Sequence, residues 1–314
     1  MKVLILGGAG FVGSHLCYSE LEAGNAVVCY DNSDGEKIHE LRNNLSFRFV
    51  RGDVMDFARV NHLIKSADLV YHLAAIADPA MYCKDPAKVL NVDMEATQNV
   101  VKACYMAGTK LVFASTSEIF GKNPDKPWDE MADRVLGPTN TSRWSYATSK
   151  AMGEHYCYAY GKYGLKFTIV RFFNFYGPRL DSLGAGRVMT CFLDRFMKGL
   201  PVMVCEPGTQ TRCFTYIDDG IAGLLIAARN NDNTSFNLGS KEEISILDLA
   251  HKMKKIGNFT SKIELVQPKD LYGEGYDDIP VRVPYCGKAR IVLGWTPTTS
   301  LDEGLRRTIE HYAN

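Results

Sequence analysis

The sequence predicts an α/β fold in which a doubly wound parallel sheet is joined to a smaller second lobe. Apolar runs of four to six residues alternate with helix-length periodic segments through the first half of the chain. Such an alternation favours right-handed crossovers between parallel strands. The second half is less regular, and its loops are rich in Gly and Pro. With 46% hydrophobic and 23% charged residues among 314, the composition is that of a globular protein.

The expected strands are rich in Val, Ile, Leu and Phe, as is typical of strands buried on both faces. They cover residues 3–6, 26–30, 47–50, 69–72, 111–114 and 167–170. The expected helices have helical periodicity and cover 13–24, 56–65, 92–108, 145–163, 216–230, 246–256 and 301–312. We assign 1–172 and about 214–256 to the sheet lobe, and about 173–213 and 257–314 to the smaller, discontinuous α/β lobe.

The formal charge of the chain is zero, because 36 Lys and Arg residues balance 36 Asp and Glu residues. A neutral chain has no general attraction for nucleic acid or an anionic membrane, so we expect neither partner. The longest apolar runs, such as 221–228, are too short to span a bilayer, and the first residues lead into a strand rather than a signal peptide. Nine cysteines, an odd number without a Cys-x-x-Cys pair, and histidines without a His-x-x-x-His pair predict a cytoplasmic protein with no metal site.

A glycine triplet follows the first expected strand directly. Gly7, Gly10 and Gly13 are spaced so that the chain turns sharply, the backbone can approach a pyrophosphate, and the next helix can pack closely on the strand. The N-terminus of that helix supplies free N–H groups and a positive dipole for the phosphates. The motif therefore predicts a Rossmann-type sheet with a dinucleotide bound at the three glycines, Phe11 and Val12.

Two carboxylates follow the next strands and bear on which dinucleotide binds. Asp31 ends the second strand, where its carboxylate can accept both adenosine ribose hydroxyls and would repel a 2′-phosphate. The residues after it include no Arg or Lys close enough to neutralise such a phosphate, so we expect NAD rather than NADP. Asp53, after the third strand, is placed to reach the adenine or, alternatively, to cap the strand end.

Tyr146 and Lys150 are four residues apart in an expected helix, so their side chains share one face, a turn apart. A phenol with a pKa near 10 acts as a base at neutral pH only if its anion is stabilised. The Lys150 ammonium and the positive charge of a nicotinamide ring can both stabilise it. The hydroxyl run 115–117 ends a parallel strand, where ligands bind in open α/β sheets, so these groups are expected to meet in one active site.

Together these motifs resemble the extended short-chain dehydrogenase/reductase family, the NAD-dependent epimerases and dehydratases that modify nucleotide sugars. The resemblance covers essentially the whole chain. Within the family, the segment 115–121 is similar to that of UDP-glucuronate decarboxylases and of GDP-mannose 4,6-dehydratases. The other segments that resemble the decarboxylases are 137–146, 171–181, 209–215, 272–276 and 282–284.

The resemblance implies an oxidation of the sugar at carbon 4. Tyr146, as a phenolate, would take the hydroxyl proton while a hydride passes to NAD. Lys150 would lower the pKa of the tyrosine and bind the nicotinamide ribose. Thr116 and Ser117 would form hydrogen bonds to the hydroxyl and the developing ketone.

The same resemblance implies a decarboxylation after that oxidation. A glucuronate 4-ketone is β to its carboxylate, so loss of carbon dioxide leaves an enolate without any need for a metal. Glu118 and Arg282 would lie at the carboxylate and the carbon-5 proton, and Arg282 would either neutralise the enolate or deliver the proton. The residues expected at the nucleotide-diphosphate sugar, with a UDP-sugar favoured, are Arg143, Asn174, Arg187, Arg212 and Arg282. Relatives pair helices equivalent to about 92–108 and 146–163 across a twofold axis, which implies a homodimer.

Other functions remain open at this stage. A 4-epimerase, a 4,6-dehydratase or a 4-dehydrogenase that releases the ketone would share the oxidation at carbon 4. A non-catalytic, NAD-sensing scaffold would keep the fold. Such proteins typically lose the tyrosine or the lysine, whereas Tyr146 and Lys150 are both present. The sequence therefore favours a UDP-glucuronate decarboxylase, a lyase of carbohydrate biosynthesis.

Overall fold

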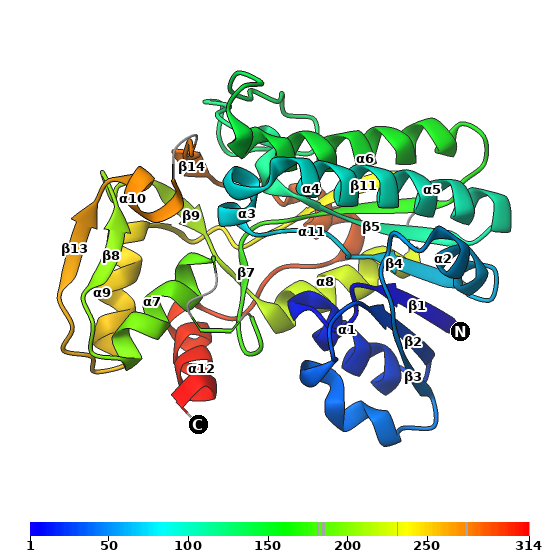
Figure 1. Cartoon of the computed structure of the whole chain (residues 1–314), viewed down its shortest axis with the longest axis horizontal. Coiled ribbons are helices and arrows are strands. Elements are labelled where there is room, and N and C mark those ends of the chain that lie inside the picture. The colour runs from blue at the N-terminus through cyan, green and yellow to red at the C-terminus, as the bar shows by residue number, and fades with distance from the viewer. Residues whose placement is uncertain (181, 184–185, 231, 274–275, 314) are drawn as a thin grey trace.

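A seven-stranded parallel sheet forms the larger of two lobes (Figure 1). The structure, a computed structural model, describes residues 1–314 except 181, 184–185, 231, 274–275 and 314. In order across the sheet, the strands are β11 (Thr234–Leu238), β6 (Phe167–Phe172), β5 (Lys110–Thr116), β4 (Leu69–His72), β1 (Lys2–Leu6), β2 (Ala26–Asp31) and β3 (Phe47–Arg51). The doubly wound fold class and the six expected strands are confirmed. Only β11 of this sheet is not among the expected strands, because Thr, Ser and Asn interrupt its apolar residues.

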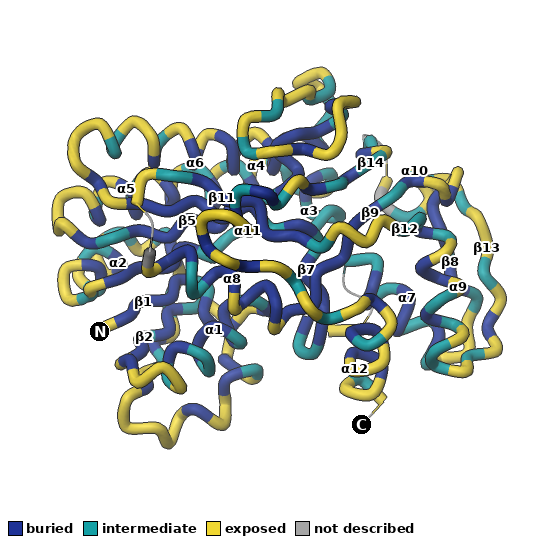
Figure 2. Tube along the Cα trace, turned by 180° about the vertical axis from the view of Figure 1, so that it is seen from behind, coloured by how far each residue is buried: buried dark blue, intermediate teal, exposed yellow. Residues whose placement is uncertain are grey.

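Helices cover both faces of the sheet. One set contains α1 (Phe11–Glu22), α8 (Ile217–Asn230) and α11 (Gly287–Leu293), and the other contains α2 (Phe57–Ile64), α5 (Ala96–Ala107) and α6 (Ser145–Gly161). Val3 and Ile5 of β1 pack in the core that includes α1 and α8, whereas Leu4 and Leu6 pack in the core that includes α2 and α5. The central strands β1, β4 and β5 are therefore buried on both faces (Figure 2), whereas the edge strand β3 has exposed residues. In the described part of the chain, no helix combines the length and apolar character needed to cross a membrane.

The connection from β4 to β5 differs from the single helix expected over 92–108. It contains α3 (Pro79–Lys84) and α4 (Pro86–Leu90), then a π-helical turn over Asn91–Glu95 that runs into α5. Asp78 and Asp85 cap α3 and α4, each through its carboxylate. A π-helical turn changes the direction in which side chains leave a helix, and such turns often occur at functional sites. Here it directs Asp93 towards the interior.

The smaller lobe is built on short strands. In one pair β8 (Val202–Cys205) runs parallel to β13 (Ile263–Val266), and in a second sheet β9 (Thr211–Cys213) lies between β12 (Glu243–Ser245) and β14 (Val281–Arg282). The helices of this lobe are α7 (Val188–Met197), α9 (Ile246–Ile256), α10 (Pro268–Tyr272) and α12 (Leu301–Ala313). The pair β7 (Phe175–Tyr176) and β10 (Thr215–Tyr216) lies between the lobes (Figure 1). The 3-10 helices are Glu36–Asn43, Ser117–Phe120 and Ser142–Trp144.

Two helices belong to a different lobe from the one to which the sequence analysis assigned them. Helix α9, within 214–256, contacts β8, β12 and α12 and so belongs to the smaller lobe. Helix α11, within 257–314, contacts α8 and β11 and so belongs to the sheet lobe. The physical reason is that helical periodicity identifies an apolar face but does not say which sheet that face covers.

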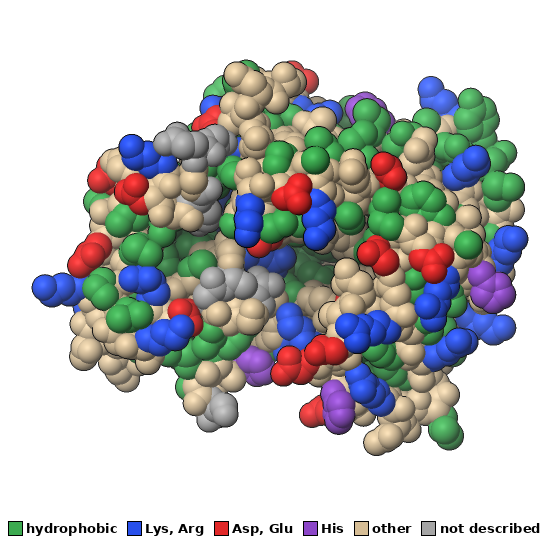
Figure 3. Space-filling model, in the orientation of Figure 1, with side chains coloured by type: hydrophobic (Ala, Val, Ile, Leu, Met, Phe, Trp, Pro, Cys, Tyr) green, Lys and Arg blue, Asp and Glu red, His purple; other side chains and the backbone are tan. Residues whose placement is uncertain are grey.

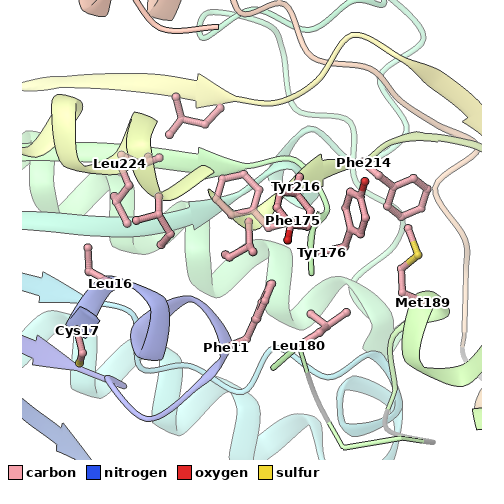
Figure 4. Packing of buried hydrophobic residues seen from close by; sticks show 14 of the residues in the cluster. Phe11, Leu16, Cys17, Phe175, Tyr176, Leu180, Met189, Phe214, Tyr216 and Leu224 are labelled. Atoms are coloured by element: carbon pink, nitrogen blue, oxygen red, sulfur yellow. The ribbon is translucent and has the colours of Figure 1, made fainter. Parts of the chain in front are cut away.

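One apolar core extends from the sheet lobe into the smaller lobe (Figure 4). In the sheet lobe it includes Leu16 of α1 and Phe11 at the first turn of that helix. Leu180 lies beside Phe11, and the cluster continues to Met189 of α7 and to Phe214. The two lobes therefore share a continuous hydrophobic interior, and the first turn of α1 takes part in it.

Candidate active site

A cavity of about 520 Å³ lies between the two lobes, and Figure 3 shows a hollow there. Residues from both lobes line it, as is common for ligand sites. The expected site residues on its wall are Phe11, Val12, Thr116, Ser117, Glu118, Tyr146, Asn174, Arg187, Arg212 and Arg282. The expected residues that do not line it directly are Gly7, Gly10, Gly13, Asp31, Asp53, Arg143 and Lys150. Residues 181, 274 and 275, in two of the segments that carry the resemblance, lie outside the described residues.

The glycine loop between β1 and α1 fits a dinucleotide. Gly7 has φ +83°, and a Cβ on Gly13 would lie 2.2 Å from the Gly7 carbonyl oxygen, so neither position admits a side chain without movement. Helix α1 begins at Phe11, and Gly10 at its N-cap provides no side-chain hydrogen bond. The first N–H groups of the helix are therefore left for an anion such as a pyrophosphate.

Asp31 and Asp53 hold their expected places at strand ends. The Asp31 carboxylate accepts hydrogen bonds from the Ala9 N–H at 3.0 Å and the Ser33 N–H at 2.9 Å, which fixes it beside the glycine loop. A carboxylate in this position fits the adenosine ribose of NAD. The Asp53 carboxylate accepts from the Met55 N–H at 2.9 Å, which is the geometry of a strand-end cap.

Tyr146 and Lys150 lie on one face of α6 and are both buried. The Lys150 ammonium donates to the Ala114 carbonyl at 3.0 Å and lies 6.0 Å from the centre of the Tyr146 ring. Burial raises the pKa of the Tyr146 phenol, and the carboxylates of Asp93 and Glu118 raise it further. Burial also lowers the pKa of Lys150. Burial therefore outweighs the expected lowering of the tyrosine pKa, and the phenol needs more positive charge nearby to ionise.

Tyr82 is a second phenol in the site that the sequence analysis missed. Its ring stacks on the Tyr146 ring, with centroids 4.6 Å apart and planes 7° apart. Tyr82 comes from α3, is buried, and contributes to the cavity wall. Nothing in the spacing of the sequence links this helix to α6, because the contact depends on how the two helices pack.

Glu118 joins residues from the two lobes. Its carboxylate accepts a hydrogen bond from Arg143 at 2.6 Å and lies 3.2 Å from Arg282 of β14. Although burial favours the neutral acid, Arg143 and Arg282 lower the pKa of the Glu118 carboxyl to about 2. Two guanidinium groups against one carboxylate leave an excess positive charge. Among the described residues, the buried Nε atoms of Arg143 and Arg282 have no hydrogen-bond partner, so the cluster is suited to an additional anion.

The other expected sugar and phosphate residues lie on the same cavity. Arg212 of β9 donates to the Asp278 carboxylate at 2.8 Å, and Arg187 lies 6.0 Å above the centre of the Phe11 ring. Asn174 has a left-handed backbone with φ 44° and donates to the Cys213 carbonyl at 2.9 Å. The structure thus brings one amide and two guanidinium groups to the wall of the smaller lobe, as a diphosphate would require.

The hydroxyl run at the end of β5 divides into two roles. Ser115 donates to the buried carboxylate of Glu154, which also pairs with Arg171. Thr116 and Ser117 are the hydroxyl residues of the run that remain for a ligand, and Thr116 accepts from the Glu118 N–H at 3.2 Å.

Comparisons with known proteins gave a family model and a curated relative that each cover most of the chain. The family model described as "NAD dependent epimerase/dehydratase family" matches residues 3–239. The UDP-N-acetyl-alpha-D-glucosaminuronate decarboxylase of Bacillus cytotoxicus is 34% identical over 315 residues, which is 99% of this chain and 97% of that protein.

Two solved structures illustrate the range of similar folds. The PbgP3 protein from Burkholderia pseudomallei superposes with a TM-score of 0.89 at 34% identity, over 99% of this chain and 96% of that one. The UDP-glucuronic acid 4-epimerase from Bacillus cereus, in complex with UDP-glucuronic acid and NAD, gives a TM-score of 0.89 at 28% identity, over 100% and 99%. The two structures therefore superpose on this chain equally well, and only the second is described by an activity.

Proposed function

Since the chain belongs to the NAD-dependent epimerase/dehydratase family of nucleotide-sugar enzymes, we propose that it is a UDP-uronate decarboxylase. Its substrate would be UDP-glucuronate or the 2-acetamido analogue. The observation that carries this proposal is the Glu118 carboxylate held between Arg143 and Arg282, with one positive charge in excess at the cavity. Such a cluster suits a sugar that carries its own carboxylate.

The enzyme uses NAD, as its family does. In our proposal the glycine loop at Gly7, Gly10 and Gly13 holds the pyrophosphate and Asp31 accepts the ribose hydroxyls, in keeping with their geometry. When bound there, NAD would supply the hydride acceptor and donor for carbon 4 and a positive charge beside the phenol.

Tyr146 is the proposed base for the carbon-4 hydroxyl. Its phenol lies on the cavity wall, and the Lys150 ammonium on the same face of α6 stabilises its anion. Thr116 and Ser117, at the end of β5, orient the hydroxyl that loses its proton. The phenol later returns the proton to the carbon-4 oxygen. Because carbon 4 also regains its hydride, the cycle has no net redox change.

The arginine cluster acts on the carboxylate. In the 4-ketone, the bond from carbon 5 to the carboxylate breaks, and its electron pair forms an enolate as carbon dioxide leaves. Arg282 stabilises the enolate charge, and a proton from solvent water then adds to carbon 5. Glu118 is ionised at neutral pH because its pKa is about 2, so in the resting site it orients the arginines and does not donate a proton.

A direct assay tests this proposal. The purified protein is incubated with NAD and either UDP-glucuronate or UDP-N-acetylglucosaminuronate, and we expect carbon dioxide release with formation of a UDP-pentose or its 2-acetamido analogue. Proton NMR of the product distinguishes this outcome from a second candidate. The Bacillus cereus structure, at a TM-score of 0.89, favours a UDP-uronate 4-epimerase as that candidate. A product that keeps its carboxylate and has inverted carbon 4 would replace the decarboxylase with the epimerase.

We also propose a homodimer through α5 and α6. Tyr105 and Met106 of α5 are 39% and 75% exposed, and Tyr163 just after α6 is 71% exposed. The Tyr105 ring contacts the rings of Tyr160 and Tyr163, which makes a contiguous aromatic surface. Light scattering of the eluting protein tests this, with twice the mass of one chain as the expected result.

A further inference from the structure

Asp93 is a buried carboxylate at the site that no step above uses. It is 2% exposed and lies in the π-helical turn Asn91–Glu95. Its Oδ1 atom accepts from the Ile76 N–H at 3.0 Å, and its Oδ2 atom accepts from the Ser149 hydroxyl at 3.4 Å. Ile76 lies in the loop after β4, and Ser149 lies in α6 directly before Lys150. These two residues therefore hold the Asp93 carboxylate in place.

Lys150 needs a counter-charge. Lys150 is 3% exposed, and the Ala114 carbonyl to which its ammonium donates carries no full charge. Burial alone lowers the pKa of Lys150, which would favour the neutral amine, and the Asp93 carboxylate acts in the opposite direction. A buried cation without an opposite charge is costly, because desolvation is not offset by the weak dipoles around it.

The other titratable groups packed around this pair are either neutral or already paired with each other. From β4, His72 has its pKa lowered to about 3 by burial and by Lys150. Burial raises the pKa of Tyr82 on α3 and of Tyr146 on α6, so both phenols keep their protons in the free protein. Glu118 and Arg143, which also act on Tyr82 and Tyr146, are paired with each other.

We propose that Asp93 is a positioning residue for the carbon-4 proton transfer: anchored by the Ile76 N–H and the Ser149 hydroxyl, its carboxylate is the counter-charge that holds Lys150 as an ammonium beside Tyr146. The same negative charge opposes ionisation of the Tyr146 phenol, so Asp93 sets the pH range in which the pair works. The effect of Asp93 on turnover rests on the proposed function. The effect of Asp93 on the charge state of Lys150 does not.

The first test is a pH profile of kcat/KM for Asp93→Asn, which removes the charge and keeps the shape. Loss of the carboxylate lowers the pKa of both Tyr146 and Lys150, so the acid and alkaline limbs both move to lower pH. A shift of about one unit would cost about tenfold in rate on the alkaline side. Asp125→Asn, which makes the same substitution at an exposed residue away from the cavity, is the matched control and should leave both limbs in place. Asp93→Glu should move the limbs back towards the wild type. A uniform loss of rate with unmoved limbs in Asp93→Asn means a structural role only and overturns the proposal.

The second test needs neither turnover nor cofactor. Protein labelled with [ε-¹³C]lysine is titrated by NMR, and the Lys150 signal is assigned by its loss in Lys150→Met. In the wild type we expect this signal to shift as Asp93 protonates near pH 6, where burial places the pKa of that carboxyl. In Asp93→Asn the Lys150 pKa should fall by about one unit or more. A Lys150 signal that does not respond to Asp93 in the wild type overturns the inference even if the variant does not fold. A response without any decarboxylation would instead overturn only the proposed function.

Discussion

The two ends of the cavity are built in different ways. Tyr146 and Lys150 come from one turn of one helix, so their relation is set by local backbone geometry. Glu118, Arg143 and Arg282 come from a 3-10 helix after β5, a 3-10 helix before α6, and a strand of the other lobe. The first end is complete within the sheet lobe, whereas the second also needs Arg282 from the smaller lobe. In the proposed mechanism, a local unit therefore carries out the oxidation at carbon 4, while the decarboxylation depends on the interface between the lobes.

The largest effect is expected at the local end. Tyr146→Phe removes the phenol oxygen and should reduce turnover about 10³-fold or more, because proton transfer loses its base. NAD binding, measured by calorimetry, should be nearly unchanged, since the glycine loop is not altered. A variant that retains most of its turnover would place the base elsewhere in the cavity.

The next effect is on stability and concerns the end shared by the lobes. Glu118→Gln leaves the buried Arg143 guanidinium without its counter-charge, which should cost about 3 kcal/mol in urea unfolding at neutral pH. The pKa of Glu118 is lowered from 4.5 in the unfolded chain to about 2, so its contribution is complete above about pH 4.5 and is lost as the pH falls through 2. The difference in unfolding free energy between variant and wild type should therefore decrease as the pH falls from 4.5 towards 2. A gap that is constant with pH would show that the carboxylate charge is not the cause.

Arg282→Gln separates the two ends most clearly. It removes the guanidinium from the other lobe and should slow carbon dioxide release about 10²-fold. Oxidation at carbon 4 should persist, so NADH should accumulate and be visible by its near-ultraviolet absorbance. Arg290→Gln, on the exposed side of α11, is a matched control in which neither signal should change. Equal loss of oxidation and decarboxylation in Arg282→Gln would mean that the two ends act as one unit.

The smallest effect is expected outside both ends. Asp31→Asn should raise the dissociation constant for NAD about tenfold and weaken discrimination against NADP, because the amide no longer repels a 2′-phosphate. The kcat at saturating NAD should stay within about twofold, since Asp31 lies at the glycine loop and not at the sugar. Fluorescence titration with NAD and NADP measures both constants. An unchanged preference would indicate that other residues select the cofactor.

The sequence was most informative where the physics is local. The glycine triplet, the four-residue spacing of Tyr146 and Lys150, and six apolar strands each follow from short-range patterns, and the strands were found as expected. The sequence was least informative about features that depend on tertiary packing. Strand β11 has a polar composition, so it lacks the apolar run from which a buried strand is predicted. No sequence pattern distinguishes Tyr82 and Asp93 as site residues. They reach the site because α3 and the π-helical turn pack against α6. Resemblance to relatives identified Glu118 and Arg282, but their distance from each other became visible only in three dimensions.

The apolar core that runs from Leu16 through Phe11 to Met189 and Phe214 has a thermal consequence. Because both lobes draw on it, neither can melt and leave the other intact. A calorimetric scan should show a single endotherm, and tight binding at the glycine loop, one residue from Phe11, should move that whole endotherm upwards instead of splitting it.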